Sequence, residues 1–530
     1  MKKWKIVFIL ALAQFVMVLD STVMNVSIST VVKDLGTSVN AMQAAITFYT
    51  LTMAAFMLIG AKLCAKWGLK RAFILGSIVY AIGSLITGLS QNITQLFLGW
   101  SVIEGLGAVL VIPAIAALIA ATYKGKDRVT AFAIIGGVSG AAAAAGPLIG
   151  GYVTTYLSWR YVFFAEVAIM AFVLLFAKSF ADAKAKDQEP LDVPSAVLSA
   201  AGMALVVFGM LQSKVWGWII PKDAPVINGH ELAPFGISIV AYLIVLGSAL
   251  LWWFYRRQKQ LEAARKNPLL QVSMFSIAQL RSGLAVLMSQ YMITAAVFFV
   301  IPIYLQIILG YDALQTGLKI FPLSVALIVF SVVGTRMVAK RSPKQIVRIG
   351  QALLVAGTVA LLVSLNETLN SVPFACAMFL VGAGLGLLAS QLGNVNMSAV
   401  SEAQTSEVGG LQGVFQNLGS SLGTALIGSV MIATLTSGFL TSVANSGLPS
   451  QTKAYIADNV QSAQIVPSSE VESLALSKGA SQGSAEELSR IYADEQLNGL
   501  REAAFFLIIL SLLSIALSRN IPSKLIGAKS

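Results

Sequence analysis

The sequence predicts an all-α polytopic membrane protein, and three observations carry this prediction. Of 530 residues, 57% are hydrophobic and 11% are charged, whereas a soluble domain is about 45–50% apolar and about 25% charged. The apolar residues form runs of about 20 residues, the length that a helix needs to cross a bilayer. The basic residues gather in short loops between these runs, as the positive-inside rule expects. These features exclude a disordered chain, a fibrous chain and an ordinary cytosolic enzyme.

Fourteen segments are long and apolar enough to be spans. They lie near 5–28, 41–61, 71–90, 95–122, 129–156, 160–179, 195–213, 235–255, 284–306, 315–338, 346–365, 373–397, 408–437 and 500–518. We expect an N-terminal six-helix bundle (1–180), two inserted transmembrane helices with linkers (181–283) and a C-terminal six-helix bundle (284–530). The last part includes a long external loop, 438–499, in which 485–499 has the pattern of an amphipathic helix.

Clusters of Lys and Arg set the orientation. Each cluster precedes the first span or follows an even-numbered span: Lys2, Lys3, Lys5; Lys62, Lys66, Lys70, Arg71; Lys124, Lys126, Arg128; Lys184, Lys186; Arg256, Arg257, Lys259, Arg265, Lys266; Lys340, Arg341, Lys344; Arg519, Lys524. The loop after span twelve, with Glu402 and Glu407, is the exception. The pattern predicts two cytoplasmic termini. The start of the chain resembles a signal peptide, but its hydrophobicity continues past 11–13, which favours an uncleaved first span.

Several kinds of chemistry are disfavoured. The only histidine, His230, lies in a polar loop, and Cys64 and Cys376 show no metal-ligand spacing. No nucleophile–base set and no Gly-Lys-Ser/Thr phosphate loop appears, so we expect neither an enzyme nor a cofactor. Although the net charge is +12, the basic residues lie in loops as membrane topology requires, which argues against nucleic-acid binding. Energy for any transport then comes from an ion gradient.

An internal repeat relates the two halves. The segment from Gly60 to Lys70 and the segment from Gly334 to Lys344 share Gly, a basic residue, Ala, Lys and Lys at the same spacing, 274 residues apart. Each segment follows the second span of a six-span block. Parallel halves around a central site are typical of a transporter, with substrate bound near the midplane.

Five segments together carry a resemblance to a known family. They are Leu19–Val26 in span one, Gly60–Arg71 after span two, Gly140–Gly151 in span five, Ser158–Phe163 at the start of span six, and Tyr304–Pro322 between spans nine and ten. In order and spacing the chain resembles the major facilitator superfamily, and within it the fourteen-span drug:proton antiporters. The resemblance implies the major facilitator fold, multidrug efflux and alternating access between two bundles.

The chain departs from the family pattern at three places. The loop motif after span two usually has an Asp where this chain has Ala65. Span four usually has an Arg followed by a Gln, and here Ser101 and Glu104 stand in that region. Span six usually has an Asn where this chain has Glu166. These departures suggest that the coupling chemistry is built around acids.

Asp20, Glu104 and Glu166 are the candidate proton-coupling and substrate residues. A charged side chain inside the bilayer is energetically costly, so an acidic residue within a span is expected to have a function. Asp20 is about 15 residues into its span, or roughly 20 Å from the span's start. We expect Glu104 near the midplane and Glu166 nearer the outer surface, with Asp20 and Glu104 facing one water-filled space. The structural alternative is an acid that only hydrogen-bonds to neighbouring helices.

Two motifs have expected mechanical roles. Small residues allow helices to approach closely and slide, and Pro147 permits a bend. The resemblance of Gly140, Gly146, Pro147, Gly150 and Gly151 to the family's antiporter motif implies exchange rather than symport. The cytoplasmic gate motif (Gly60, Lys66, Gly68, Lys70, Arg71) is expected to set the gate and the topology. The alternative for the glycines is ordinary tight packing.

Polar and aromatic residues inside the spans are candidates for the cavity wall, because such sites combine apolar walls with few polar groups. They are Gln14, Asn25, Trp100, Gln290, Tyr291, Phe298, Gln391, Asn394, Gln412 and Gln416. For each one, packing between helices is the alternative.

The sequence thus predicts a proton-coupled multidrug exporter of amphipathic, cationic small molecules, monomeric, in a bacterial plasma membrane. The first alternative is an exporter or flippase-like carrier of a lipid or metabolite, with altered or no proton coupling. The second is a membrane sensor or assembly partner that uses 438–499 for contacts.

Overall fold

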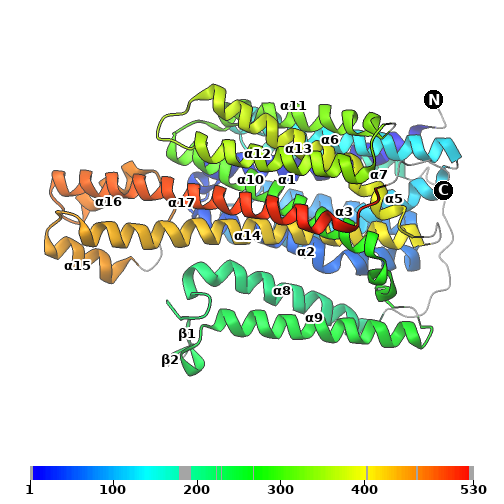
Figure 1. The fold of residues 1–530 in the computed structure, drawn as a ribbon, viewed down its shortest axis with the longest axis horizontal. Coiled ribbons are helices and arrows are strands. Elements are labelled where there is room, and N and C mark those ends of the chain that lie inside the picture. Colours follow the sequence, from blue (N-terminus) through cyan, green and yellow to red (C-terminus); the bar gives the residue numbers. More distant parts are fainter. Residues whose placement is uncertain are drawn as a thin grey trace.

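The computed structural model describes residues 4–123, 125–177, 192–222, 224–227, 230–266, 268–338, 340–400, 404–460 and 464–523. Some residues used above for orientation lie outside the described residues, namely Lys2, Lys3, Lys124, Lys184, Lys186, Glu402 and Lys524. The described residues form long helices with one small hairpin (Figure 1).

The first part of the chain holds the elements of the first six spans. They are α1 (Lys5–Asp34), α2 (Val39–Trp67), α3 (Leu69–Gly88), α4 (Ile93–Leu96), the π-helix η2 (Phe97–Glu104), α5 (Gly105–Thr122), α6 (Gly125–Tyr156) and α7 (Arg160–Ala177). The fourth span is continuous through α4, η2 and α5.

The middle of the chain is a helical pair. It consists of α8 (Val193–Trp216), β1 (Val226–Ile227), β2 (His230–Glu231), η3 (Pro234–Gly236), α9 (Ile239–Ala263) and η4 (Val272–Ser276). The pair lies along one flank of the molecule, with the antiparallel β1–β2 hairpin at its tip (Figure 1). At its other end the Arg257 guanidinium donates two hydrogen bonds to Asp192 and lowers the pKa of that carboxyl.

The last part holds the second set of spans and a projecting segment. Its elements are α10 (Ala278–Pro302), the π-helix η5 (Ile303–Ile308), α11 (Ala313–Met337), α12 (Pro343–Ser364), α13 (Ser371–Met397), α14 (Thr405–Asn445), α15 (Ser450–Asn459), α16 (Ser468–Ser477), α17 (Gln482–Leu517) and η7 (Ser518–Asn520).

Thirteen described helices are long and apolar enough to cross a membrane, or fourteen if the bent α6 is one span. The bend in α6 is 43° and separates Ile134–Ala143 from Ala145–Tyr156. Pro147 explains it, because proline lacks the N–H that would bond to residue 143 and its ring clashes with that carbonyl. The protein is therefore an all-helical, multi-pass membrane protein.

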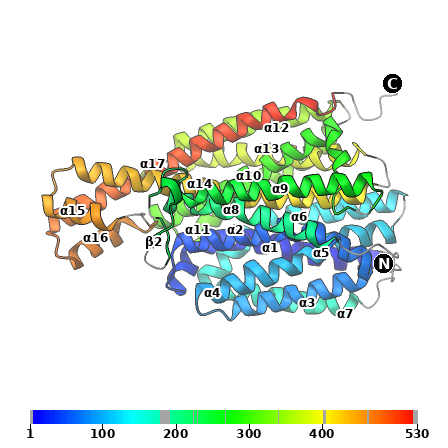
Figure 2. The ribbon, with the colours of Figure 1, turned by 90° about the horizontal axis from the view of Figure 1, so that it is seen from below.

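The segment 438–499, expected as a long external loop that contains one amphipathic helix, is mostly helical. The helix α14 continues to Asn445, and α17 begins at Gln482 and runs without a break into the last span. Together with α15 and α16 these helices project beyond one end of the bundle (Figure 2). Hydropathy marks where apolar sequence stops, not where the helix stops. The expected helix at 485–499 is confirmed as part of α17.

The two ends of the bundle differ. The helices α15 and α16 extend from one end, which we call the projecting end. The helix α1 begins and α17 finishes at the other, which we call the terminal end (Figure 1). The repeated segments lie in corresponding places near the terminal end. A Cβ at Gly60 of α2 would strike Val109 of α5, and a Cβ at Gly334 of α11 would strike Ser390 of α13.

Gln43 joins three helices near the projecting end. Its Nε2 donates to the carbonyls of Thr424 (2.9 Å) and Ala425 (3.3 Å) on α14, and its Oε1 accepts from Lys214 Nζ on α8 (2.7 Å). Gln43 and Lys214 are both buried. This amide therefore ties the inserted pair to both six-helix bundles.

We expect Gln43→Leu to lower the free energy of unfolding by about 1–3 kcal/mol, because it leaves the Lys214 ammonium buried without its partner. Thermal unfolding of the detergent-purified protein measures this. The double variant Gln43→Leu/Lys214→Met removes both polar groups and should recover most of the loss. Equal stability of the single variant and the wild type would contradict this role of Gln43.

Candidate functional site

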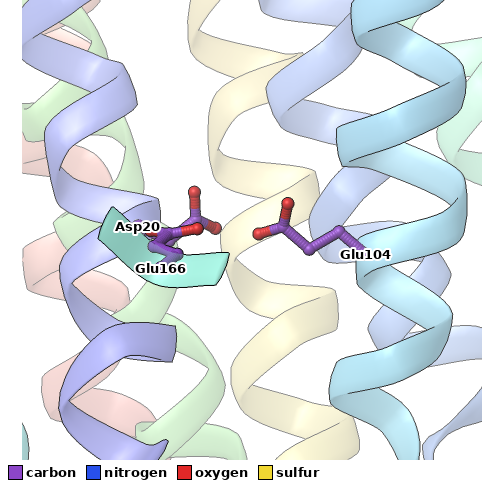
Figure 3. Close-up of side chains that lie close together, drawn as sticks. All are labelled: Asp20, Glu104 and Glu166. Carbon is purple, nitrogen blue, oxygen red and sulfur yellow. The ribbon is translucent and has the colours of Figure 1, made fainter. Parts of the chain in front are cut away.

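Three acidic side chains from three helices meet inside the first bundle. Asp20 comes from α1, Glu104 from the last residue of η2 and Glu166 from α7. One carboxylate oxygen of each lies within 4.8 Å of the others, and the side chains point toward one another (Figure 3). Their exposed fractions are 1%, 0% and 1%. We call these residues the acid cluster.

The acids differ in their hydrogen bonds. Both oxygens of Asp20 accept from the indole Nε1 of Trp100, each at 3.0 Å. One oxygen of Glu166 accepts from Ser84 Oγ at 3.1 Å. Among the described residues, neither oxygen of Glu104 has a hydrogen-bond partner, nor has the second oxygen of Glu166. A buried polar group without a partner is expensive, and the cost is greatest when the Glu104 carboxyl is ionised.

Local helix geometry positions Glu104. The π-turns of η2 shift the register of span four just before this residue, and π-bulges are frequent at functional sites. The backbone of α3 also approaches closely, because a Cβ at Gly83 would overlap the backbone of Glu104. The stacked rings of Tyr49 and Trp100, 4.9 Å apart, form the wall beside Asp20.

Two expectations about the acids are wrong. Glu166 does not lie nearer one surface than the other two acids, since its carboxylate is within 4.8 Å of theirs. The expected depths came from the number of residues between each acid and the start of its span. Such a number gives the depth only if all spans begin at the same depth in the bilayer and contain no π-turns such as those of η2. Asp20 and Glu104 do face the same point, but they are buried there and do not line a water-filled space.

Of the cavity candidates, Trp100 is the one that bonds to the acid cluster. Asn25 donates to Ser21 on its own helix, and Gln14 is half-buried. The other candidates belong to the second bundle. Gln290 donates to Leu385, Gln391 to Gly334 and Gln412 to Gly393, Phe298 is buried, Tyr291 and Gln416 are half-buried, and Asn394 is exposed.

The antiporter motif divides into two parts. A Cβ at Gly146 or Gly150 would strike Thr22 or Val23 of α1, and a Cβ at Gly151 would strike Ala313 of α11. These glycines allow close approach, as expected. Gly140 and the nearby Gly136 and Gly137 have nothing within 4 Å of the Cβ position, so no helix packs closely against them in this structure.

The two bundles contact each other near the projecting end. Gln306 Nε2 of η5 donates to the Val26 carbonyl of α1 at 2.7 Å, and the Leu314 N–H of α11 donates to Thr155 Oγ1 of α6 at 3.1 Å. Gly317 of α11 lies against the Pro147 carbonyl. The π-turns of η5, directly after Pro302, aim Gln306 across the interface.

The gate motif lies at the terminal end. Gly68 has φ +91°, a conformation that suits glycine, and links α2 to α3. Lys66 and Arg71 are exposed beside it, and Lys70 is half-buried.

Sequence reasoning missed several residues of the site. Ser84 and Tyr49 contact the acid cluster or its wall, and Tyr80, one turn before Ser84 on α3, is buried beside Gly107 of α5. Asp34 was missed too: it pairs with Arg160 and accepts from Trp159 Nε1 at 3.0 Å. Serine and tyrosine are common in membrane spans, so their presence alone does not mark a site. Only their positions in the spans relative to those of the acids could have indicated that they lie nearby.

Two helical bundles, the first of which encloses three buried acids, in a chain with this many membrane-crossing helices, are typical of a polytopic membrane transporter. A model of the Major Facilitator Superfamily matches residues 10–424, and the chain belongs to that superfamily. The superfamily consists of transporters, so the protein is a transporter of small molecules and not an enzyme.

Several relatives are resistance proteins. The chain is 28% identical over 434 residues to a puromycin resistance protein of Streptomyces alboniger, covering 81% of each chain. It is 27% identical to a tetracenomycin C resistance and export protein of Streptomyces glaucescens, covering 84% of this chain and 79% of that one. It is 23% identical to the multidrug resistance protein Stp of Mycobacterium tuberculosis (strain CDC 1551 / Oshkosh), covering 80% and 75%.

Solved structures share the fold. A bacterial homologue of the human lysosomal transporter Spinster, inward-facing and unoccupied, aligns with TM-score 0.59 and 14% identity over 98% of this chain and 97% of that one. A D-xylose–proton symporter aligns with TM-score 0.56 and 11% identity over 80% and 89%. At these identities the likeness shows the fold alone.

Proposed function

We propose that the protein is a proton-coupled exporter of amphipathic, cationic small molecules that works by alternating access in a bacterial plasma membrane. Relatives named for antibiotic resistance and export support export of drug-like molecules. The acid cluster supports the coupling to protons. The proton gradient is then the energy source, and no cofactor is required.

The acid cluster is the observation that carries the proposal. Two unit charges at the observed separation of 4.8 Å or less repel by about 3–4 kcal/mol at an effective dielectric constant of about 20. Burial adds several kcal/mol for each ion. Three buried carboxylates therefore do not carry three negative charges unless a cation neutralises them. They hold protons, or they hold a cation.

The three acids divide two roles in the exchange, binding of the cation and carriage of protons. Asp20, whose oxygens both accept the Trp100 indole N–H, binds the cationic group of the substrate. Glu104 and Glu166, which have unpartnered oxygens, carry protons. Arrival of the cation makes release of a proton favourable, and return of a proton displaces the cation. The rings of Tyr49 and Trp100 offer the apolar surface that an amphipathic cation requires.

The contacts between bundles supply the alternation. We assign the projecting end to the outside and the terminal end, with both chain termini, to the cytoplasm, since basic residues such as Lys66 and Arg71 gather there. The bundles are then closed outside through Gly151, Ala313 and Gly317, and the open space at Gly140 faces inward. A monomer contains both bundles and is sufficient for this cycle.

The departures from the family pattern favour one second candidate. Ala65 stands where the family's loop motif usually has an Asp, and Ser101 stands where span four usually has an Arg. A carrier of a lipid or metabolite with altered or no proton coupling is compatible with these changes and uses the acids for substrate binding.

Transport into everted membrane vesicles separates the two candidates. An imposed gradient, acid inside, should drive uptake of a lipophilic cation by the wild type, and a protonophore should abolish it. Uptake that does not respond to the gradient would favour the second candidate. Absence of uptake of every cation tested would overturn the proposal of cation export.

A further inference from the structure

A groove runs between α11 and α13 on the surface of the second bundle. Its volume is about 640 Å³, and Pro322, Val372, Cys376, Phe379 and Leu380 line it. Val372 is 71% exposed and Phe379 42% exposed, and neighbouring Phe321 is 43% exposed. Apolar side chains this exposed on a membrane-spanning bundle face lipid, so acyl chains have access to the groove.

A positive charge lies at one end of the groove. Lys319 is two turns into α11, and its Nζ donates to the Ser371 hydroxyl, which also lines the groove, at 2.7 Å. The same ammonium lies 5.8 Å from the centre of the Tyr311 ring. Among the described residues, no carboxylate pairs with Lys319 within 4.0 Å. The ammonium therefore retains donors and charge for an anion.

The place of Lys319 along the helices suits a lipid headgroup. Both α11 and α13 begin at the projecting end, at Ala313 and Ser371. Lysine extends its ammonium toward the headgroups from such a position, and tyrosine is enriched at the same level. The first N–H groups of α13, whose N-cap Asn370 makes no side-chain cap, add partial positive charge beside Ser371.

We propose that this groove binds an anionic phospholipid from the leaflet at the projecting end. The phosphate contacts Lys319 and Ser371, and one acyl chain lies along Cys376 and Phe379. Because α11 closes against α6 on another of its faces at Gly317, the bound lipid stabilises the helix on which outer closure depends. This proposal does not depend on the identity of the exported substrate.

The chain contains a natural reporter for this site. It has two cysteines, of which Cys376 is exposed in the groove and Cys64 is buried. We would measure the rate at which a maleimide labels Cys376 in the full-length protein in detergent, with added phosphatidylglycerol or phosphatidylcholine. Peptide mass spectrometry separates the two cysteines.

Phosphatidylglycerol should slow labelling about fivefold more than phosphatidylcholine, the effect of one basic residue on an anionic lipid. Lys319→Gln should remove the difference, Lys319→Arg should retain it, and the matched outer variant Lys222→Gln should leave it unchanged. Equal slowing by both lipids, or a difference that survives Lys319→Gln, would overturn the proposal. Equal slowing by soluble glycerol phosphate would also overturn it, because the site would then bind an anion rather than a lipid.

Discussion

Replacing Asp20 by Asn is expected to abolish gradient-driven exchange and to weaken binding of a lipophilic cation about 10- to 100-fold. The magnitude follows because loss of an interaction with a charged partner costs about 1.5–3 kcal/mol. The volume of the side chain and its place beside Trp100 are retained, so the loss reports the charge. Equilibrium binding to the purified protein and uptake into vesicles measure the two effects.

Glu486→Gln on α17 is the matched control, because it removes one acid from the projecting segment outside the acid cluster. This control should bind and transport like the wild type. Wild-type binding together with wild-type gradient dependence in Asp20→Asn would show that Asp20 is a structural acid.

Valine at Gly317 is expected to open the contact between bundles at the projecting end and to stop transport. Its Cβ would overlap the Pro147 carbonyl of α6. Overpacking costs about 1–3 kcal/mol, which shifts the balance between open and closed forms about 5- to 150-fold. Cross-linking of Thr155→Cys to Leu314→Cys, in a background without native cysteines, measures closure because these residues are bonded across the interface.

The same substitution at Gly140 is the control, since nothing lies within 4 Å of its Cβ position. Gly140→Val should cross-link like the parent protein. Undiminished cross-linking and transport in Gly317→Val would mean that closure at this contact does not limit the cycle.

Hydropathy and charge were sufficient to predict the fold class, because the bilayer imposes the length of each span and the side on which basic residues lie. The same signals did not predict the helices at 438–499, which continue beyond the end of the bundle (Figure 2). Amphipathic helices such as α17 near Leu488 have weak hydropathy, and a helix that leaves the membrane has no reason to end there.

The site was predictable in one respect. An ionisable residue in an apolar span is costly wherever it lies, so Asp20, Glu104 and Glu166 could be named without a structure. Asp20 and Glu104 were expected to face each other, but the sequence did not predict that Glu166 joins them. The meeting point depends on the π-turns of η2 and on the close approach at Gly83. Neither has a strong sequence signature.

Links between helices were the least predictable feature. Gln43 and Lys214 are 171 residues apart in the sequence. A buried hydrogen bond between two such distant side chains leaves no local sequence pattern from which it could be predicted. Lys214 lies directly after the predicted span 195–213, and nothing in the local sequence indicates that its side chain is buried. Its burial against Gln43 became visible only with the packing of α8 on α2 and α14.

The most direct test of the account is proton release from the purified protein in detergent on addition of a lipophilic cation, in a weakly buffered solution with a pH indicator. The wild type should release protons in proportion to bound cation, and Asp20→Asn and Glu104→Gln should release few or none. Cation binding without proton release from the wild type would contradict the central claim that substrate and protons compete for the acid cluster.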